Sequence, residues 1–563
     1  MEAIIECVPN FSEGIDKDII QQISQAIEKA VGVTLLNVDP GTATNRTVMT
    51  FVGHPLNVME AAYQAIKKAG ELIDMRKHKG EHPRIGATDV CPLIPVANIT
   101  LEETAEYAKQ LAKRVADELS LPVYLYEAAQ ADGKRTNLSI IRAGEYEGFF
   151  EKIKLPEWKP DYGPAEFDAK RGATVIGARD FLVAFNINLN TTSVRRANAI
   201  AFDVREAGRV KREGDPLSGR IIKDVNGVPV NIPGSLKSVK AIGWFIKEYD
   251  IAQISMNLTD LNTTPVHIAF DEVCIKAAAR GIRVTGSELV GLIPLQSMLA
   301  AGKYFLHKQK RSTGVSDKDL IKVAIRSMGL NELAPFNPKE RIIEYMLEKN
   351  EGNKLVDLSL EEFADETASE SPAPGGGSVA AYVGSLGISL ATMVANLSAH
   401  KKGWDEKWKQ FSDWAEIGQQ FKKELLTLVD EDTQAFNKIM AAMALPKSSE
   451  HEKTLRYNSI QEATKNAIKV PLRVMELAHS SMLTIKAVAE YGNPASISDA
   501  GVGALCARTA VVGAFLNVMI NMESCDDKIF VTQVKQKAEE IRKSAVAMEA
   551  AILEIVYGKI RRA

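Results

Sequence analysis

The spacing of apolar residues changes along the chain, and these changes predict its domains. Between residues 16 and 31, Ile20, Ile23 and Ile27 recur at the spacing of one helical face, whereas the flanking segments are short and β-branched. The first elements follow the order β-α-β-β-α-β, which is typical of a split βαβ sandwich with helices against one face of a sheet. The predicted segments are strand 2–8, helix 16–31, strands 33–38 and 47–52, helix 55–74, strand 90–96, helix 101–119 and strand 122–126.

Two further changes in pattern divide the rest of the chain. The uninterrupted apolar run 181–187 is typical of an inner strand and opens a second α/β region that reaches about residue 300. Residues 327–338 lose periodicity and contain two prolines, and helical spacing then continues to the C-terminus. We therefore predict a multidomain chain with α/β subdomains over 1–178 and 179–326, a linker over 327–338 and an all-α helical bundle over 339–563.

Composition excludes several classes of protein. The 563 residues include 69 Lys and Arg against 72 Asp and Glu, a net charge of −3, which gives no indication of a nucleic acid or an anionic membrane as partner. The five scattered cysteines form no Cys-x-x-Cys pair, so they argue against a zinc cluster or a disulfide framework and fit a reducing cytoplasm. The N-terminus shows no pattern of a secretory signal. The apolar run 378–400 is rich in small residues, which suits a buried helix better than a membrane span.

Familiar nucleotide and hydrolase motifs are absent. Residues 172–177 have the glycine spacing of a phosphate loop, but Ala178 and Arg179 follow where Lys and Ser or Thr are required. No Gly-x-Gly-x-x-Gly follows a predicted strand, and no Gly-x-Ser-x-Gly occurs. The sequence therefore gives no support to a kinase, a nicotinamide dehydrogenase or a serine hydrolase.

Candidate chemistry is concentrated first in the loop 77–92. Two of the chain's eight histidines, His78 and His82, lie there among lysines, Arg84 and carboxylates. Histidine titrates near neutrality, so the loop could supply a proton donor or acceptor beside an anion-binding rim. The alternative is a solvated basic loop, which composition alone favours.

The helical part contains two more candidates. Gly375, Gly376 and Gly377 precede Ser378 at the start of an Ala-rich helix, where converging backbone N–H groups favour a carboxylate or phosphate; a flexible hinge is the alternative. Further on, Asp432 shares a helical face with Phe436, so it could face a cleft in which burial raises its pKa. A solvated acidic helix face is the alternative, and Asp430 is expected to point to solvent.

These stretches together resemble one family. The first half resembles glutamate formiminotransferase in residues 6–14, in Asp39, in the loop 80–87 and in the segment 162–179. The last part resembles formiminotetrahydrofolate cyclodeaminase from its Pro-Gly-Gly-Gly-Ser start. The whole chain is therefore similar to the formiminotransferase-cyclodeaminase family, with matches in the same order over nearly the full length.

The resemblance implies two folate reactions. The formimino group of N-formiminoglutamate passes to N5 of tetrahydrofolate, and N10 then attacks that carbon and expels ammonia to give 5,10-methenyltetrahydrofolate. Both reactions exchange amines at one carbon, so they need positioning and proton transfer, with no metal or redox cofactor. The expected setting is histidine degradation and one-carbon metabolism in the cytoplasm.

The resemblance also implies roles for individual residues. His82 is the expected catalytic residue of transfer, and Asp432 that of cyclisation, with Asp430 as the alternative. Asp39 is expected to orient His82 or hold the pterin, unless it only caps a turn, and Arg84 is expected to bind a substrate carboxylate, unless it forms a surface salt bridge. His78 is expected to stay solvated. The expected folate-binding stretch is Gly163, Pro164, Ala165, Glu166, Phe167, Asp168, Ala169, Lys170, Arg171 and Gly172, and the second anion site is Gly375, Gly376, Gly377 and Ser378.

Further expectations concern the pocket and the assembly. Asn493 and Asp499 are expected either to line the pocket of Asp432 or to cap helices. A polyglutamylated folate could stay tethered between the two sites through its anionic tail, with Lys401 and Lys402 in a basic track. A homo-oligomer is expected. The alternatives are a transferase with an inactive helical half, which also leaves open a formyl donor, and a non-catalytic folate-binding or assembly protein.

Overall fold

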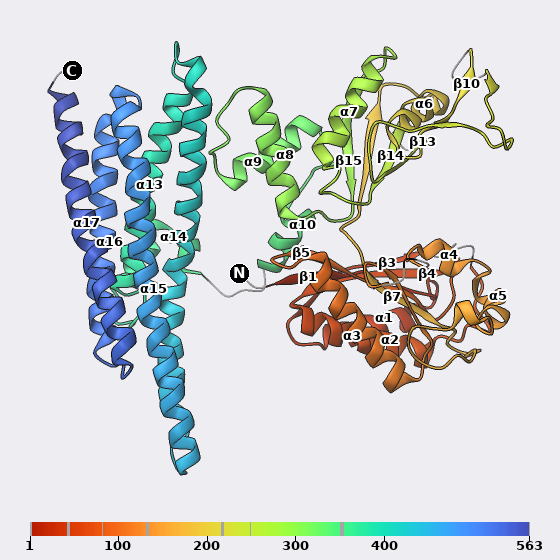
Figure 1. The fold of residues 1–563 in the computed structure, drawn as a ribbon, viewed down its shortest axis with the longest axis horizontal. Helices are drawn as coiled ribbons and strands as arrows, with labels where there is room; N and C mark the ends of the chain where they lie inside the picture. The colour runs from red at the N-terminus through yellow and green to blue at the C-terminus, as the bar shows by residue number, and fades with distance from the viewer. Residues whose placement is uncertain are drawn as a thin grey trace. The chain divides into compact units, whose positions relative to one another are not determined.

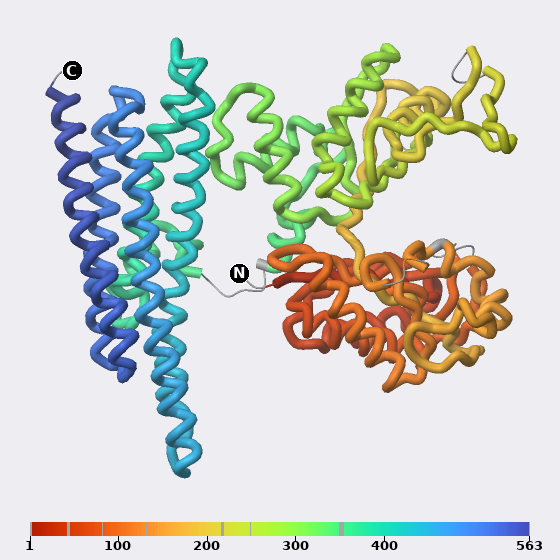
Figure 2. The backbone as a smooth tube through the Cα atoms, viewed as in Figure 1, coloured from red at the N-terminus to blue at the C-terminus, as the bar shows by residue number. Residues whose placement is uncertain are grey.

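The computed structural model describes residues 3–41, 45–80, 83–130, 133, 135–214, 219–247, 249–348 and 354–561. Their packing forms two compact units. The first contains 1–297 and 328–347, and the second contains 298–327 and 348–563. The chain thus passes from the first unit to the second, back again, and finally into the helical part (Figure 2).

The first sheet of the α/β unit has seven strands. Its strands are β1 (Ile4–Cys7), β2 (Asn10–Phe11), β3 (Val33–Gly41), β4 (Arg46–Gly53), β5 (Thr88–Ala97), β6 (Val123–Glu127) and β7 (Thr174–Ala178). Because β1 and β2 both pair with β4 and β5, the spatial order is β3, β4, then β1 and β2 in one row, then β5, β7 and β6. The stretch that lacked a complete phosphate-loop motif forms β7, which pairs in parallel with β5 and β6.

Three amphipathic helices cover one face of this sheet (Figure 1). They are α1 (Lys17–Glu28), α2 (Pro55–Leu72) and α3 (Leu101–Leu119). Asp16 caps α1 by accepting from the N–H groups of Asp18 and Ile19, and Thr100 and Glu103 form a capping box on α3. The opposite face is partly covered by α4 (Leu138–Arg142), α5 (Glu145–Lys152) and the short turn η1 (Pro156–Trp158).

The second sheet repeats the core of the first. Strands β8 (Val183–Leu189), β13 (Val239–Ile246), β14 (Ile251–Leu258) and β15 (Val284–Val290) pair in the order β13-β14-β8-β15, all antiparallel, with α6 (Val194–Val204) and α7 (Val266–Ala278) against them. This is the order of β3-β4-β1-β5, so both subdomains confirm the predicted split βαβ arrangement. Four two-residue strands between α6 and β13 form two small pairs: β9 (Arg209–Val210) with β12 (Asn231–Ile232), and β10 (Arg212–Glu213) with β11 (Arg220–Ile221).

The second unit is built on five long helices, as predicted (Figure 1). They are α13 (Gly376–Ala399), α14 (Trp408–Met443), α15 (Glu450–Tyr491), α16 (Ile497–Met522) and α17 (Lys528–Ile560). Helix α13 packs against α14 and α16, and α15 packs against α14, α16 and α17. The remaining helical segments of the chain are α8 (Leu295–Lys308), α9 (Asp317–Met328), α10 (Pro338–Arg341), α11 (Ile343–Glu348), α12 (Leu360–Thr367) and the turns η2 (Leu355–Asp357), η3 (Asp405–Lys407) and η4 (Pro494–Ser496).

Two segments of this unit are long and apolar enough to cross a membrane, 376–399 and 494–522. In the first, 61% of the most apolar window is buried inside the unit, and in the second 39%. Small residues let α13 and α16 approach each other closely. A Cβ added to Gly387 would lie only 2.8 Å from the backbone oxygen of Gly503. Packing within the bundle therefore explains most of the apolar character of α13.

The limits of the two compact units differ from the predicted domain boundary at residue 326 and the predicted linker over 327–338. The carbonyl oxygen of Gly314 accepts from Asn396 at 2.9 Å and from Gln419 at 3.1 Å, which fastens 298–327 to the helical unit. Residues 328–347 return to the α/β unit, where Asn188 donates to Glu332 at 2.7 Å. Within the predicted linker, Met328 and Leu330 are buried.

Candidate active sites

A cleft of about 850 Å³ lies within the α/β unit and is lined by both of its subdomains. It lies at the C-terminal ends of β6 and β7, since Tyr126, Glu127 and Ala178 line it. The first subdomain contributes Arg142 and Arg179, and the second contributes Lys240 and Asp260. A concave site with a few convergent charged groups is the usual form of a small-molecule site.

Arg84 lies beside this cleft but its guanidinium is already occupied. The side chain is only 5% exposed, and it donates to Glu145 at 2.9 Å and to Glu147 at 2.6 Å. Its Nε donates to Nδ1 of His78 at 3.2 Å, and Nε2 of His78 lies 2.8 Å from the carbonyl oxygen of Asn45. The prediction of a solvated His78 is therefore wrong, because this ring is half-buried and bound on both sides.

A second arginine, Arg142, reaches the cleft from the end of α4. It forms an ion pair with Asp89, which is fully buried and also accepts from the backbone N–H of Ile85 at 3.0 Å. Arg46 lies in the same electrostatic neighbourhood, where burial and then Arg142 lower its pKa while Asp89 and Asp39 oppose them. The structure thus brings Asp39 towards this cluster. Sequence reasoning missed Arg142 and Asp89, although an aspartate inside an apolar strand was an available signal.

The segment 163–172 borders the same region but uses much of its polarity internally. Asp168 pairs with Arg171 at 2.6 Å, Arg171 also donates to the carbonyl oxygen of Leu119 at 2.7 Å, and Lys170 donates to that of Glu71 at 2.8 Å. Phe167 packs against aromatic rings of α5. These contacts fix the path of the segment, and strand β7 begins at Thr174, two residues after Gly172. His82 lies outside the described residues; Pro83, next in the chain, lines the cleft.

The second candidate site lies where α13 begins against α14. The backbone N–H of Ser378 donates to Oδ2 of Asp432 at 3.0 Å, and the Ser378 hydroxyl donates to the carbonyl oxygen of Val429 at 2.7 Å. A Cβ on Gly377 would collide with the Asp432 carboxylate, so only glycine allows this approach. The glycine-rich start of α13 therefore receives a carboxylate, and that carboxylate is the chain's own.

Burial distinguishes Asp432 from its neighbours. Desolvation raises the pKa of Asp432, and the two hydrogen bonds from Ser378 only partly oppose this. Asp430 does not point to solvent as predicted: it is half-buried and accepts from the backbone N–H of Leu355 at 2.7 Å. Asp430 therefore has a structural role, while the raised pKa of Asp432 is the kind of perturbation found at functional sites.

Asn493 and Asp499 do not line the pocket of Asp432. The backbone N–H of Asn493 donates to Ser398 at 2.8 Å, and its side chain caps η4 by accepting from Ala495. Ser398 is twenty residues along α13 from Ser378, which corresponds to roughly 30 Å of helix. Asp499 lies near the same far end, because Asn517, eighteen residues further along α16, is the neighbour of Gly376. Helix capping is the correct interpretation of Asn493.

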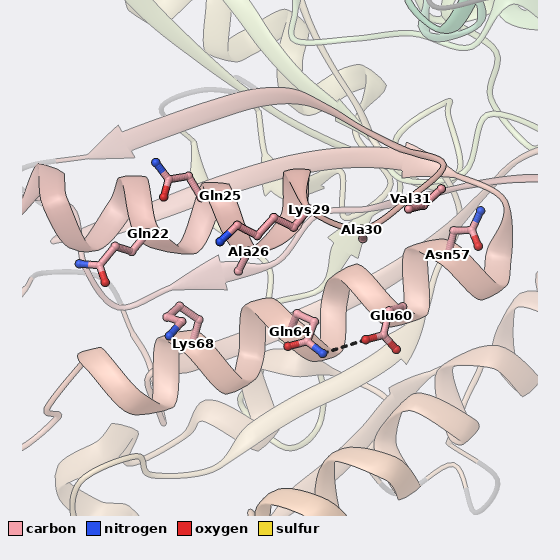
Figure 3. A pocket seen from close by; sticks show the side chains of 10 residues that line it. All are labelled: Gln22, Gln25, Ala26, Lys29, Ala30, Val31, Asn57, Glu60, Gln64 and Lys68. Carbon is pink, nitrogen blue, oxygen red and sulfur yellow. Dashed lines mark hydrogen bonds between the residues drawn. The ribbon is translucent and has the colours of Figure 1, made fainter.

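Another groove, of about 720 Å³, lies between α1 and α2 on the helical side of the first sheet (Figure 3). Its walls are mostly amides and lysines, with Gln64 donating to Glu60 at 2.8 Å. None of the predicted site residues lines it. The candidate chemistry therefore lies in the cleft between the two α/β subdomains and at the start of α13.

Comparisons with known proteins cover both candidate sites. The family model of the formiminotransferase domain, N-terminal subdomain, matches residues 4–179, and that of the formiminotransferase domain matches 184–348. The model of formiminotransferase-cyclodeaminase matches 359–540. The three matches follow the two α/β subdomains and the helical bundle in turn.

Individual relatives match either the whole chain or one of its parts. The chain is 43% identical to the formimidoyltransferase-cyclodeaminase of Gallus gallus over 558 residues, 99% of each chain. It is 38% identical to the glutamate formimidoyltransferase of Streptococcus pyogenes serotype M1, over 54% of this chain and 94% of that one. It is 36% identical to the methenyltetrahydrofolate cyclohydrolase of Methylorubrum extorquens, over 36% of this chain and 97% of that one.

Proposed function

The chain belongs to the formiminotransferase-cyclodeaminase family, and we propose that His82 and Asp432 move the protons in its two reactions. It is a bifunctional folate enzyme. The α/β part transfers the formimino group from N-formimino-L-glutamate to N5 of tetrahydrofolate, and the helical part closes the ring to 5,10-methenyltetrahydrofolate and releases ammonia.

The transfer step requires a proton to leave one nitrogen and reach another. N5 of tetrahydrofolate attacks the formimino carbon and becomes positively charged, and the tetrahedral intermediate then breaks its bond to the glutamate nitrogen. His82 takes the proton from N5 and returns it to the departing nitrogen, because an imidazole near its own pKa can do both at neutral pH. The cleft lined by both subdomains supports this proposal, since it has room for a folate head group beside the loop.

In the cyclisation step the leaving group is ammonia. N10 attacks the formimino carbon and its proton passes to the formimino nitrogen, which becomes an amino group; a second proton then lets this nitrogen leave as ammonia. Asp432 is the proposed donor, and the observation behind this assignment is its burial against Ser378, because desolvation raises the pKa of this carboxyl and so favours its protonated form. The N-terminus of α13 then stabilises the carboxylate that remains after the proton has been donated.

The test separates the two activities in the full chain. His82→Ala is expected to abolish transfer, by at least roughly a hundredfold as for loss of a general base, and to leave cyclisation of supplied 5-formiminotetrahydrofolate intact. Asp432→Asn is expected to do the reverse. Transfer is followed by glutamate release, and cyclisation by the absorbance of methenyltetrahydrofolate.

Asp430→Asn is the matched control for Asp432→Asn, because it changes an acid two residues away on the same helix and should leave cyclisation within a few-fold of normal. If both principal variants lose both activities while folded, the assignment of one activity to each part is wrong. A chain that transfers but never cyclises supplied intermediate would instead indicate an inactive helical half.

Assembly is part of the proposal. Helices α13 and α16 pack side by side, and both expose large apolar side chains at helical spacing: Leu386, Met393 and Leu397 on α13, and Val502, Leu516 and Ile520 on α16. Contiguous exposed apolar residues favour association. We propose that two copies associate through this face, that the substrate is the polyglutamylated folate, and that the protein works in the cytoplasm, in keeping with five cysteines that form no disulfide among the described residues.

A further inference from the structure

Arg142 is a partly buried cation that lines the cleft between the two α/β subdomains and keeps hydrogen-bonding capacity. Its side chain is 14% exposed and its ion pair with Asp89 uses one terminal nitrogen. Its Nε is buried and has no hydrogen-bond partner among the described residues. A guanidinium offers five N–H donors, so an arginine held by one carboxylate oxygen can still accept a second anion.

Two anchors fix this arginine in place. Asp89 is rigid, because it is fully buried on β5 and holds the backbone N–H of Ile85. The carbonyl oxygens at the end of α4 are gathered by Lys152, whose ammonium donates to Ile140 at 3.0 Å, Ile141 at 2.8 Å and Ala143 at 2.8 Å. A preorganised cation loses little entropy when it binds an anion.

The charges around Arg142 favour an additional anion. Burial and then the nearby Arg142 lower the pKa of Arg46, and the carboxylates that oppose this are the buried Asp89 and the exposed Asp39. Arg84, the arginine expected from the sequence to bind substrate, is instead held by Glu145 and Glu147. Among the cations that line the cleft, Arg142, Arg179 and Lys240, Arg142 is the one that a fully buried carboxylate, Asp89, holds in place.

We infer that Arg142, with Arg46 beside it, is the subsite that binds one carboxylate of the amino-acid donor. This inference rests on the proposed function, because the proposed function places the donor in the cleft between the two α/β subdomains. The ligand is a dicarboxylic amino acid, and one of its two carboxylates meets the guanidinium of Arg142 while Asp89 holds that group from the other side. Arg84 is then a positioning residue that orders α5 and the loop.

The experiment compares donors that differ by one charge. N-formimino-L-glutamine and N-formimino-L-isoglutamine each replace one carboxylate of the donor by an amide. The wild-type chain is expected to prefer the diacid over one of these amides by roughly 10- to 100-fold in kcat/KM, as for loss of one charge-assisted pair. In Arg142→Gln the ratio of kcat/KM between the diacid and this amide should fall to about one, whereas the ratio between the diacid and the other amide should stay as in the wild type. Arg142→Lys should keep part of the first preference.

Arg135→Gln is the matched control. Arg135 is similarly buried at 12% exposure and also pairs with an aspartate, Asp161, but it does not line the cleft. It should keep both preferences even if its activity falls. A folded Arg142→Gln that still discriminates between acid and amide as the wild type does would overturn the inference.

A readout without turnover separates this inference from the proposed function. Titration calorimetry should show that the wild type binds L-glutamate at least tenfold more tightly than the weaker of L-glutamine and L-isoglutamine, and that Arg142→Gln binds that pair equally. Wild-type chain that binds glutamate in this way but transfers nothing would refute the proposed function and leave the subsite standing. Equal binding of all three by the wild type would overturn the subsite.

Discussion

At the scale of single residues, burial decides which charged groups are ready for chemistry. Arg84 and Arg142 both lie at the cleft or beside it, yet two glutamates hold the guanidinium of Arg84, whereas the Nε of Arg142 has no hydrogen-bond partner among the described residues. Asp430 and Asp432 are two residues apart, yet one caps a backbone N–H group and the other sits at the start of α13. In both pairs the sequence offered equivalent residues, and contacts with distant segments made them different.

Glu6 shows the same effect in a residue that no sequence pattern singled out. It is 4% exposed on β1, and burial raises its pKa to about 7, against an opposing contribution from Arg179. The pKa of Glu6 is therefore higher in the folded than in the unfolded state. At low pH the carboxyl is protonated in both states and does not oppose folding, and the free energy of unfolding falls as the pH rises from about 4.5 to about 7.

We therefore expect Glu6→Gln to stabilise the first subdomain by about 3 kcal/mol at pH 8.5 and by far less at pH 5. The measurement is amide hydrogen exchange of β1 and β5, with variant and wild type compared at the same pH so that intrinsic rates cancel. Glu28→Gln on the exposed side of α1 is the control and should change nothing. Faster exchange in Glu6→Gln at pH 8.5 would contradict the assignment of a strained, ionised Glu6.

At the scale of elements, the start of α13 depends on glycine for a steric reason. Gly375 has nothing within 4 Å of the position of a Cβ, whereas Gly377 meets the carboxylate of Asp432. The three glycines look alike in the sequence, and the neighbours that distinguish them are Asn517 of α16 beside Gly376 and Asp432 of α14 beside Gly377. The predicted anion site at this helix end is thus a site for an internal carboxylate.

Gly377→Ala is expected to push Asp432 away from α13 and to reduce cyclisation by roughly 100-fold, the order of loss that a displacement of about 1 Å can cause. Gly375→Ala is the matched variant, two residues earlier, and should cyclise normally. Supplied 5-formiminotetrahydrofolate isolates this step from transfer. Equal activities for the two variants would show that the contact between Gly377 and Asp432 does not position the reacting group.

At the scale of the whole molecule, the apolar stripes on α13 and α16 predict an assembly. Leu516 and Ile520 are 63% and 64% exposed, and covering each would contribute roughly 1.5–3 kcal/mol. Replacing both by Glu is therefore expected to weaken association at least tenfold, measured by sedimentation equilibrium. Ile529→Glu, at a 75% exposed position on α17, is the control. A wild-type chain that is monomeric at micromolar concentration would refute the proposed interface.

Much of the architecture could be predicted from local periodicity. The helix expected over 101–119 is α3, with the same limits, and the strand expected over 90–96 lies within β5. Both result from side chains a few residues apart, which the sequence displays directly. Strand β7 was missed because its apolar run is only a few residues long, and the contacts of Gly314 with α13 and α14 join residues too far apart for a local pattern to show.

The sequence by itself determined the elements, the α/β and helical parts, and the family resemblance that points to His82 and Asp432. Only the tertiary structure decided that Arg142 can still bind an anion whereas the guanidinium of Arg84 is taken up by two glutamates. It also decided that Asp432 and not Asp430 contacts the start of α13, and that Asn493 lies at the far end of the bundle. The physical reason is that pKa and hydrogen-bonding capacity depend on neighbours in space. Arg142 meets Asp89 across 53 residues and Ser378 meets Asp432 across 54, separations at which local sequence patterns contain no information about contact.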